Sequence, residues 1–300
     1  MSKEPLVSII VNCFNGEKYL HKSLDSIISQ TYKNWEIIFW DNQSTDKSSE
    51  IFKKYKDSRF KYYLASKHEK FLYKARNLAI QKAKGDFMAL LDVDDWWLPN
   101  KLERQIPLFN NSNIGLVYGN LWYQIEKKNK KKILKKDILP TGKILSELLD
   151  DYVIRTATMV VRKKCLESLK YKFNDNFHIM GDYDLNLRIA SQWEIGCIQD
   201  PVAFVRIHGQ NETIKKKEKY IDEFKMWYNQ MKNDKIISSN KNFQNIPKKI
   251  NYIETMHYLF NDVFSKNFLR VAKYPLSLDK IKLIFALFLP KFIIRMIRGY

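Results

Sequence analysis

Three carboxylates at the end of an apolar run are the residues of this sequence best suited to chemistry. The run Phe87 to Leu91 is predicted to be a buried strand, and Asp92, Asp94 and Asp95 follow it directly. In an extended backbone Asp92 and Asp94 project to the same side, where two like charges repel unless a cation or a proton relieves them. Mg²⁺ or Mn²⁺ would fit, because such ions take oxygen ligands from one or two carboxylates and from phosphates. A turn that caps the next helix is the alternative for these acids taken alone.

Strands and helices alternate around this segment, so the predicted fold class is α/β. Strands are expected at residues 6–11, 36–40, 60–64, 114–118, 121–125, 157–161, 195–198 and 202–207. Helices are expected at residues 20–28 and 75–82, in a segment that ends at residue 52, and in a segment that starts at residue 182. This alternation predicts a mainly parallel sheet between two layers of helices, a Rossmann-like arrangement that binds ligands beyond the carboxyl ends of its strands. Asn12, Asp41 and Asp92 fall at such ends.

The usual phosphate-binding fingerprints are absent. The sequence has nine glycines and contains neither GxGxxG nor GxxxxGK[ST]. A phosphate ligand would therefore need another anchor, and a metal ion on the carboxylates is the candidate.

The composition predicts a folded, basic protein with anionic partners. Hydrophobic residues make up 45% of the 300, enough for a sizeable core, and 52 Lys and Arg against 33 Asp and Glu give a net charge of +19. Seven lysines lie between 127 and 136, in an expected solvated loop, and residues 215–300 carry 18 Lys and Arg against 7 Asp and Glu. A nucleic-acid interface would need basic residues interleaved with aromatic ones on one surface, so a nucleic-acid partner is not expected.

The cysteines and the N-terminus indicate a protein of a reducing cytosol. Cys13, Cys165 and Cys197 are odd in number and widely spaced, which favours neither a disulfide framework nor a zinc site. Residues 6–14 are interpreted as a first strand rather than a signal peptide, and no stretch has the roughly 18 apolar residues of a membrane span.

The C-terminal part is predicted to be a separate helical, basic region. We place the boundary so that residues 1–212 form one domain and 213–300 the other. Within the latter, 278–298 is apolar, with a kink expected at Pro290 and with Lys291, Arg295 and Arg298 along one face. This pattern is typical of a helix lying on an anionic membrane surface; the alternative is a terminal helix packed on the protein's own core.

Five segments, in this order, resemble the family 2 glycosyltransferases, an inverting group with the GT-A nucleotide-sugar fold. They are VSIIVNCFNGEKYL, WDNQSTD, ARNLAIQKAKGDFMALLDVDDWWLPNKLERQ, GDYDLNLRIA and VRIHGQNET. The resemblance covers roughly residues 5–212. It implies a nucleotide-sugar donor, a divalent metal (Mn²⁺ or Mg²⁺) and a glycan or lipid-linked acceptor.

The resemblance also implies roles for single residues. Asp41 would contact a uracil-type base, and the nucleotide pocket would further contain Asn12, Phe14, Glu17, Arg76 and Asp92. Asp92 and Asp94 would bind the metal and the diphosphate, with His208 as a further contact.

On the acceptor side, Asp182 would be the general base, and Asp184 is expected to be structural. Gly181 stands where the family commonly has Glu, beside the sugar or acceptor. Trp96 is expected either to flank the sugar or acceptor or to belong to the core. Further departures from the family pattern at Asn12, Asn42 and Gln43 leave the choice of nucleotide open, although UDP is favoured.

We therefore expect a metal-dependent, inverting glycosyltransferase of surface-polysaccharide biosynthesis. It would act on a lipid-linked or oligosaccharide acceptor, as a peripheral protein on the cytoplasmic face of the inner or plasma membrane. The alternatives are a nucleotidyltransferase on a similar sheet and a basic nucleic-acid-binding protein.

Overall fold

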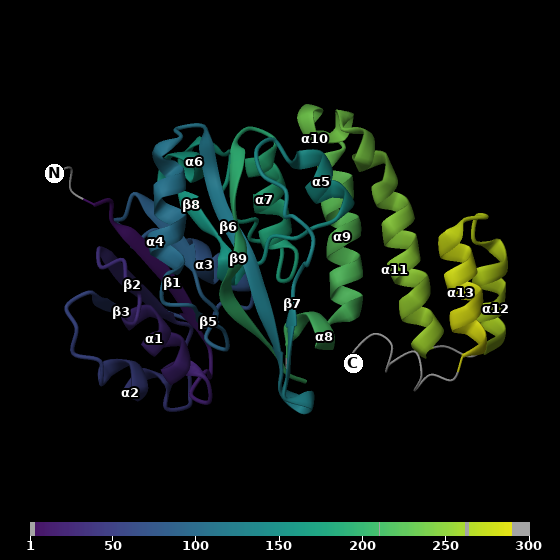
Figure 1. The fold of residues 1–300 in the computed structure, drawn as a ribbon. Coiled ribbons are helices and arrows are strands. Elements are labelled where there is room, and N and C mark those ends of the chain that lie inside the picture. Colours follow the sequence, from purple (N-terminus) through teal and green to yellow (C-terminus); the bar gives the residue numbers. More distant parts are fainter. Residues whose placement is uncertain (1–3, 210, 262–263, 290–300) are drawn as a thin grey trace. The chain divides into compact units, whose positions relative to one another are not determined.

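The computed structural model describes residues 4–209, 211–261 and 264–289 (Figure 1). The chain divides into two compact units, Met1–Asn211 and Glu212–Tyr300. Among the described residues, the first unit holds all the strands and the second holds helices only.

Four parallel strands form one half of the sheet. Strands β1 (Val7–Cys13), β2 (Trp35–Asp41), β3 (Phe60–Leu64) and β4 (Phe87–Leu90) lie in the order β3-β2-β1-β4. They are joined by helices α1 (Leu20–Ile28), α2 (Ser48–Lys53) and α3 (Leu72–Ile80). The predicted alternation of strands and helices is confirmed in this half.

The sheet lies between two layers of helices. Alternate residues of each strand face opposite sides of the sheet, so each strand packs against both layers. One face of β1 joins the apolar side of α1 in a buried core that includes Val7, Ile9, Val11, Leu20, Leu24 and Ile27. Helix α3 packs against β1 and β2 and takes no part in that core. The side chain of Asn12, between Val11 and Cys13, therefore points to the α3 side.

The other half of the sheet is mixed in direction, so the prediction of a mainly parallel sheet is only partly right. Strand β8 (Val160–Arg162) pairs antiparallel with β4, β6 (Ile114–Ile125) pairs antiparallel with β8, and β9 (Glu194–Ile207) runs parallel to β6. Strand β5 (Trp96–Trp97) closes the edge, antiparallel to β9. A strand buried on both faces has the same apolar pattern in either direction, so the sequence could not show which way it runs.

Short helices surround this half of the sheet. They are α4 (Lys101–Gln105) with the 3₁₀ helix Ile106–Asn110, α5 (Leu145–Asp150), α6 (Lys163–Ser168), α7 (Gly181–Ala190) and the 3₁₀ turns Glu126–Lys128 and Thr156–Thr158. Helix α7 begins where the sequence predicted a helix, and it carries Asp182 in its first turn.

Residues 114–118 and 121–125, predicted to be two strands, form the single strand β6. At Gly119-Asn120, between the two predicted strands, the register of β6 against β9 is irregular. A Cβ on Gly119 would lie 2.9 Å from Val202 Cγ2, so glycine permits this close approach. The Asn120 side chain donates to Lys135 O at 2.8 Å instead of closing a turn.

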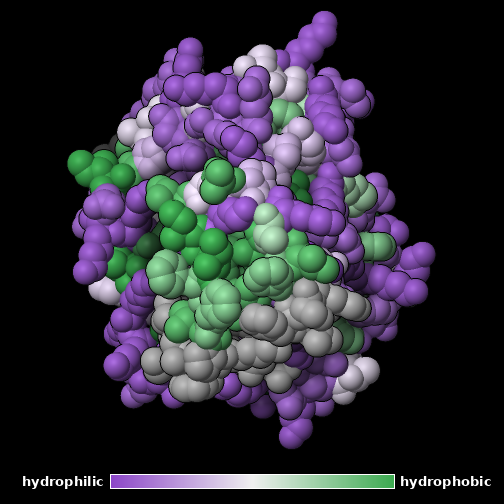
Figure 2. Space-filling model, turned by 90° about the vertical axis from the view of Figure 1, so that its right-hand side faces the viewer, coloured by the Kyte–Doolittle hydropathy of each residue, from purple (hydrophilic) through white to green (hydrophobic). Residues whose placement is uncertain are grey.

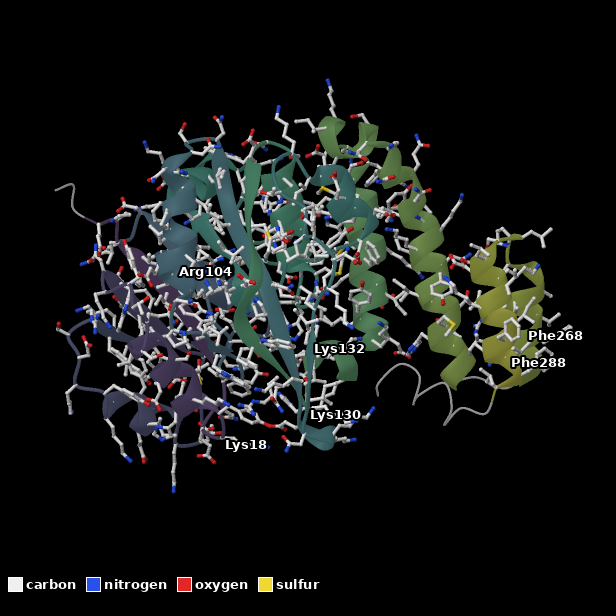
Figure 3. All side chains as sticks on the ribbon, in the orientation of Figure 1. Lys18, Arg104, Lys130, Lys132, Phe268 and Phe288 are labelled. Atoms are coloured by element: carbon white, nitrogen blue, oxygen red, sulfur yellow. The ribbon has the colours of Figure 1, made fainter. Side chains whose placement is uncertain are left out.

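Three further predictions need correction. The lysine-rich segment is not only a loop, because β7 (Lys130–Ile133) pairs antiparallel with β6 while Lys130 and Lys132 stay exposed (Figure 3). Residues 195–198 and 202–207 belong to one strand, β9, whose register is irregular near Pro201. Residues 157–161 begin as a 3₁₀ turn and become strand only at Val160.

The second unit is helical, as the sequence indicated. It contains α8 (Glu212–Lys215), α9 (Lys217–Met231), α10 (Lys235–Ser239), the 3₁₀ helix Lys241–Asn245, α11 (Ile246–Asn261), α12 (Phe264–Lys273) and α13 (Leu278–Phe288). The last three pack around a small core of Met256, Leu259, Val271, Tyr274 and Leu283. The expected kink at Pro290 and the basic face of Lys291, Arg295 and Arg298 lie outside the described residues.

Helix α13 turns an apolar face outward. Leu283 is fully buried, whereas the opposite side of the helix exposes Leu278, Ile281, Ile284, Phe285 and Phe288. Figure 2 shows hydrophobic residues gathered on the face that carries α12 and α13, and Figure 3 shows Phe268 and Phe288 pointing away from these helices. No helix within the described ranges is both long enough and apolar enough to cross a membrane.

Candidate active site

The carboxyl ends of β1, β2 and β4 meet at one edge of the sheet. Cys13 lies beside Asp41 in the register of β1 and β2, and Ile10 lies beside Leu90 in that of β1 and β4. The acids that follow β4 are therefore close to the ends of β1 and β2. This is the arrangement that the parallel pattern predicted.

The acids after β4 form a turn and not an extended segment, so the expectation of extended backbone was wrong. Asp95 N donates to Asp92 O at 3.1 Å, which closes a turn over residues 92–95, here called the acidic turn. Asp92 and Asp94 nevertheless interact, because the charge of Asp92 helps to raise the pKa of Asp94. Two like charges thus share this edge of the sheet.

Arg76 connects the acidic turn to Asp182. Its guanidinium is buried, with 3% of the side chain exposed, and donates to Asp92 Oδ1. Burial alone would lower the pKa of Arg76, but nearby acidic groups, Asp92 foremost and Asp182 among them, outweigh it and the pKa is raised. This buried cation thus interacts electrostatically with both Asp92 and Asp182, which are distant in the sequence.

Asp94 and His208 form a pair on the other side of the acidic turn. Asp94 Oδ2 lies 2.9 Å from His208 Nε2, and the two side chains are 24% and 10% exposed. Burial, followed by the charge of Asp92, raises the pKa of Asp94. His208 therefore reaches the acidic turn from the end of β9, which stops at Ile207.

Arg206 fixes the acidic turn from β9. Its backbone N–H donates to Asp95 Oδ1 at 2.9 Å, and its Nε donates to Asp94 O at 2.9 Å. Asp95 is buried, and burial raises its pKa well above the usual value. Asp95 therefore holds the turn in place and leaves Asp92 and Asp94 for ligands.

Asp182 is held by three hydrogen bonds at the start of α7. Tyr73 Oη donates to its Oδ1 at 3.1 Å, Thr156 Oγ1 to its Oδ2 at 3.4 Å, and Tyr183 N to its Oδ1 at 2.8 Å. Burial raises the pKa of Asp182, while the charges of Arg76 and Arg155 act to lower it. The raised pKa makes this carboxylate a stronger proton acceptor than a free Asp.

Gly181 makes room for the tyrosine that orients Asp182. A Cβ at this position would lie 2.4 to 2.6 Å from atoms of the Tyr73 ring. The Tyr73 hydroxyl contacts both Ile179 O and Asp182 Oδ1, each at 3.1 Å. The absence of the expected Glu is thus explained, because any side chain at 181 would displace Tyr73.

Asn12 has a buried side-chain amide that is not satisfied. Both its Nδ2 and its Oδ1 are buried and have no hydrogen-bond partner among the described residues. An unpaired buried amide costs about 1–3 kcal/mol, and such a group in a native structure calls for an explanation such as a ligand.

Phe14, two residues further, is exposed, and its ring centroid lies 4.5 Å from that of His68. This pair offers an aromatic surface beside Asn12. His68 is fixed by Asn42, whose backbone carbonyl lies 3.0 Å from His68 Nδ1. Such a surface suits the stacking of a planar ring.

Asp41 and Glu17 brace the surrounding loops. Asp41 is buried, accepting from Ser44 N and from Tyr62 Oη, both at 2.7 Å. Glu17 is exposed and accepts from Lys47 N at 2.9 Å. Each carboxylate oxygen keeps a second lone pair, so a contact of Asp41 with a base remains a proposal.

Trp96 and Asp184 are both buried. Trp96 is 9% exposed, with its ring stacked on Phe204 at 4.8 Å and the Arg206 guanidinium 4.8 Å from the ring centroid. Asp184 is fully buried and pairs with Arg188 at 2.7 Å, as expected of a structural residue.

The residues present fit a divalent ion that completes its coordination with phosphate oxygens. The part of the chain that the structure describes has no group of three or more His, Cys, Asp or Glu arranged to hold a metal. Mg²⁺ and Mn²⁺, however, commonly use one or two carboxylates plus substrate phosphates. Asp94 with His208, and Asp92 beside them, offer such a partial set.

Sequence reasoning missed the groups that position these residues: Tyr73, Thr156, Arg155, His68 and Arg206. Tyr73 and Arg206 could have been found from their spacing. Tyr73 precedes Arg76 by three residues on one helix, so the two share a face, and Arg206, on a strand, stands two residues before His208. His68 lies in a loop and Thr156 in a short 3₁₀ turn, and neither position could be connected with the site from the sequence.

Comparison with known proteins decides the family. The sequence pattern described as "Glycosyl transferase family 2" matches residues 8–177, more than half of the chain. The chain belongs to this family. Asp182 and His208 lie beyond the matched segment, so their place in the site rests on the geometry above.

Related family 2 sequences match part or most of the chain. The UDP-Glc:alpha-D-GlcNAc-diphosphoundecaprenol beta-1,3-glucosyltransferase WfgD of Escherichia coli is 36% identical over 168 residues, which is 56% of this chain and 64% of WfgD. The match thus spans slightly less than two thirds of WfgD. An uncharacterized glycosyltransferase of Methanocaldococcus jannaschii is 32% identical over 228 residues, 72% of this chain and 77% of that protein.

Solved structures confirm the GT-A fold expected for a family 2 chain. Staphylococcus aureus TarS 1-349 in complex with UDP-GlcNAc superposes with a TM-score of 0.66 at 16% identity, over 94% of this chain and 81% of that one. The mannosyltransferase PcManGT of Pyrobaculum calidifontis, in complex with GDP-Man and Mn²⁺, gives a TM-score of 0.63 at 15% identity, over 100% and 85%.

Proposed function

We propose that this family 2 protein is an inverting glycosyltransferase that uses a nucleoside diphosphate sugar, with UDP favoured. The observation that carries the proposal is the buried Arg76. Its guanidinium contacts Asp92 of the acidic turn, and its positive charge acts to lower the pKa of Asp182. A cation next to two acids would suit a site where a diphosphate leaves and a hydroxyl attacks.

The donor would lie along the carboxyl edge of the sheet. Its base would stack near Phe14 and His68, and a polar group of the nucleotide would pair with the amide of Asn12. The diphosphate would approach the acidic turn, where Arg76 supplies one positive charge. In this position Arg76 would orient the leaving group and stabilise its developing charge.

Asp182 would act as the general base. The acceptor oxygen forms a bond to the anomeric carbon, the bond from that carbon to the diphosphate breaks, and the hydroxyl proton passes to the Asp182 carboxylate. Attack opposite to the leaving group inverts the anomeric centre. Tyr73 and Thr156 hold the carboxylate in position throughout.

A divalent metal would be held by Asp94 and His208, with Asp92 beside them. When bound, it would neutralise negative charge on the diphosphate. The need for it would also explain why two acids are kept together at this edge.

We further propose that the acceptor is lipid-linked or a growing surface glycan, reached at the cytoplasmic face of a membrane. WfgD, whose name specifies a diphosphoundecaprenol acceptor, supports this choice. So does the outward apolar face of α13, because exposed Ile281, Phe285 and Phe288 can enter the boundary of a bilayer.

The function can be tested with a panel of nucleotide sugars and lipid-linked acceptors, with and without Mn²⁺. We expect the nucleoside diphosphate as the released product and an inverted anomeric centre; release of pyrophosphate would indicate nucleotidyl transfer instead.

Asp182→Asn should lower kcat by about 10²- to 10⁴-fold and keep thermal stabilisation by the donor. Asp94→Asn should weaken the metal dependence. Asp200→Asn, at an exposed acid, is the matched control. Full turnover by Asp182→Asn would contradict the assignment.

A further inference from the structure

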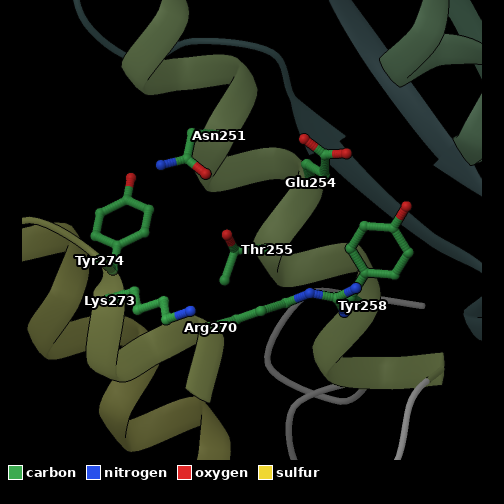
Figure 4. A pocket seen from close by; sticks show the side chains of 7 residues that line it. All are labelled: Asn251, Glu254, Thr255, Tyr258, Arg270, Lys273 and Tyr274. Atoms are coloured by element: carbon green, nitrogen blue, oxygen red, sulfur yellow. The ribbon is translucent and has the colours of Figure 1, made fainter. Parts of the chain in front are cut away.

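Polar side chains of the two units differ in their access to water. In the second unit they line a pocket of about 400 Å³ between α11 and α12 (Figure 4), and its described lining includes exposed side chains such as Asn251 and Lys273. In the first unit, Lys101 and Gln105 of α4 have no exposed surface at all. Polar groups buried in this way need partners within the protein, and the partners of these two lead to Asp182.

Lys101 is a buried lysine with no acid beside it. Within the described ranges, no carboxylate lies within ion-pair distance of its amine, and burial lowers its pKa well below the usual value. The amine donates to Gln105 Oε1 at 2.7 Å and lies 4.2 Å from the centroid of the Trp97 ring. An apolar side chain would fill the same space without the cost of burying an amine, so the role of the amine lies in these two contacts.

Gln105 transmits the contact with Lys101 to a short turn. Its Oε1 faces the lysine, and its Nε2 donates to Thr158 O at 2.8 Å and to Val117 O at 3.4 Å. Carbonyl oxygens can only accept hydrogen bonds. A donor on the Oε1 side therefore fixes the amide in the orientation that Thr158 requires.

Trp97 holds the same turn from β5. Its Nε1 donates to Ala157 O at 2.8 Å, and the side chain is 2% exposed. Ala157 and Thr158 belong to the 3₁₀ turn Thr156–Thr158, here called the threonine turn. Trp97 and Gln105 both come from the segment that follows the acidic turn in the chain, so this segment binds two carbonyls of the threonine turn.

The threonine turn acts on Asp182. Thr156 Oγ1 donates to Asp182 Oδ2 at 3.4 Å, and the charge of Arg155, the residue before the turn, acts to lower the pKa of Asp182. Arg155 is fixed to the turn, because Thr158 donates to Arg155 O through both its N–H and its hydroxyl, each at 2.8 Å. A movement of the turn would therefore displace a hydrogen-bond donor and a positive charge beside the carboxylate.

We propose that Trp97, Gln105 and Lys101 are positioning residues, which hold the threonine turn so that the Asp182 carboxylate keeps a fixed place relative to the acidic turn. The inference rests on the proposed role of Asp182 as the general base. The three side chains need not touch the substrate, since they act through the turn. Attack opposite to the leaving group requires the proton acceptor and the diphosphate site to be held in register, and this buried chain of contacts links the two.

Trp97→Phe, in the full-length protein, tests the link from β5. It keeps an aromatic ring and removes the N–H that binds Ala157 O. We expect kcat for the nucleotide sugar that the panel above selects to fall about tenfold, because small displacements of a reacting group slow turnover. The KM for the donor should stay within about twofold, because the donor site is unchanged. Amide hydrogen exchange over residues 155–159 should become faster in the absence of substrate.

Trp35→Phe is the matched control. It makes the same change at a buried indole that begins β2, at the end of the strand opposite to the carboxyl edge. Its Nε1 has no hydrogen-bond partner among the described residues. We expect this variant to leave kcat and the exchange of residues 155–159 unchanged, whatever it does to stability.

Two further variants test the rest of the chain of contacts. Lys101→Met removes the donor to Gln105 and keeps an unbranched side chain, and it should lower kcat without changing the KM for the donor. In a Thr156→Val background, the loss of kcat caused by Trp97→Phe should become smaller, because both substitutions act on Asp182 through the same turn.

Normal kcat and normal exchange in Trp97→Phe and Lys101→Met, beside a slow Asp182→Asn enzyme, would overturn this inference alone. An equal loss of kcat in Trp35→Phe would overturn it as well, since the effect would then be general destabilisation. Full turnover by Asp182→Asn would instead refute the proposed general base, and with it the need to position one. If the buried variants do not fold, Thr156→Val, at a half-buried residue, tests the last contact by itself, and normal kcat there would overturn the inference.

Discussion

Gly181→Ala should damage both the stability and the activity of this protein, although alanine normally favours a helix. Gly181 is the first residue of α7, and its added Cβ would lie 2.4 to 2.6 Å from three atoms of the Tyr73 ring. Unstrained carbon atoms lie about 3.5–4.0 Å apart. The ring, which is 3% exposed and packed on Phe173, would therefore have to move by about 1 Å.

The cost follows from this displacement. Overpacking of a buried site costs about 1–3 kcal/mol, whereas alanine in a helix gains at most about 1 kcal/mol over glycine. We expect a net loss of up to about 2 kcal/mol in the free energy of unfolding, from the difference of those ranges. The same shift would lengthen the 3.1 Å bond from Tyr73 to Asp182. A misplacement of about 1 Å can reduce turnover about 10²-fold.

Urea unfolding and turnover of the nucleotide sugar would measure the two effects. Gly209→Ala is a control for stability, because a Cβ there meets nothing within 4 Å. Repeating Gly181→Ala in a Tyr73→Ala background removes the clash, so the substitution should become neutral or stabilising. If the two substitutions were instead additive, the contact with Tyr73 would not be the cause, and the account of Gly181 would be refuted.

Two further predictions concern the charge and the surface. Arg76 lowers the pKa of Asp182, and a base must be ionised to accept a proton; Arg76→Gln should therefore move the acidic limb of the kcat/KM profile to higher pH, and an unchanged limb would argue against the coupling. For α13, Ile281→Ser/Phe285→Ser should weaken sedimentation with anionic vesicles about tenfold or more, because less apolar surface would be buried in the bilayer. Leu64→Ser/Ile138→Ser, at exposed apolar residues of the first unit, should have little effect, and equal losses would exclude α13 as the contact.

Local patterns in the sequence were enough to predict the strands and helices of the parallel half of the fold. The β3 range of 60–64 and the α1 range of 20–28 follow from apolar spacing that only a strand or a helix can satisfy. Strand direction and continuity depend on neighbours that are distant in sequence. Gly119-Asn120 has the composition of a turn, yet it lies inside β6, where a Cβ on Gly119 would lie 2.9 Å from Val202 Cγ2 of β9.

The site was predictable to the extent that its residues stand at the ends of strands. Asp92 and Asp94 could be placed by the length of the apolar run before them. The backbone of the acidic turn could not, because Arg206 and His208 reach it from more than one hundred residues away. Tyr73 was missed for a similar reason, since only the fold brings its hydroxyl to Asp182.

The unfavourable features of this edge all become favourable in the presence of one class of ligand. Asn12 leaves an amide buried and unpaired, and Asp92 and Asp94 are kept together at the expense of a raised pKa for Asp94. Each lowers the stability of the protein alone. A ligand with a hydrogen-bonding base and a cation-bound diphosphate would relieve both at once, so a folding cost at the sheet edge would become binding energy for that ligand.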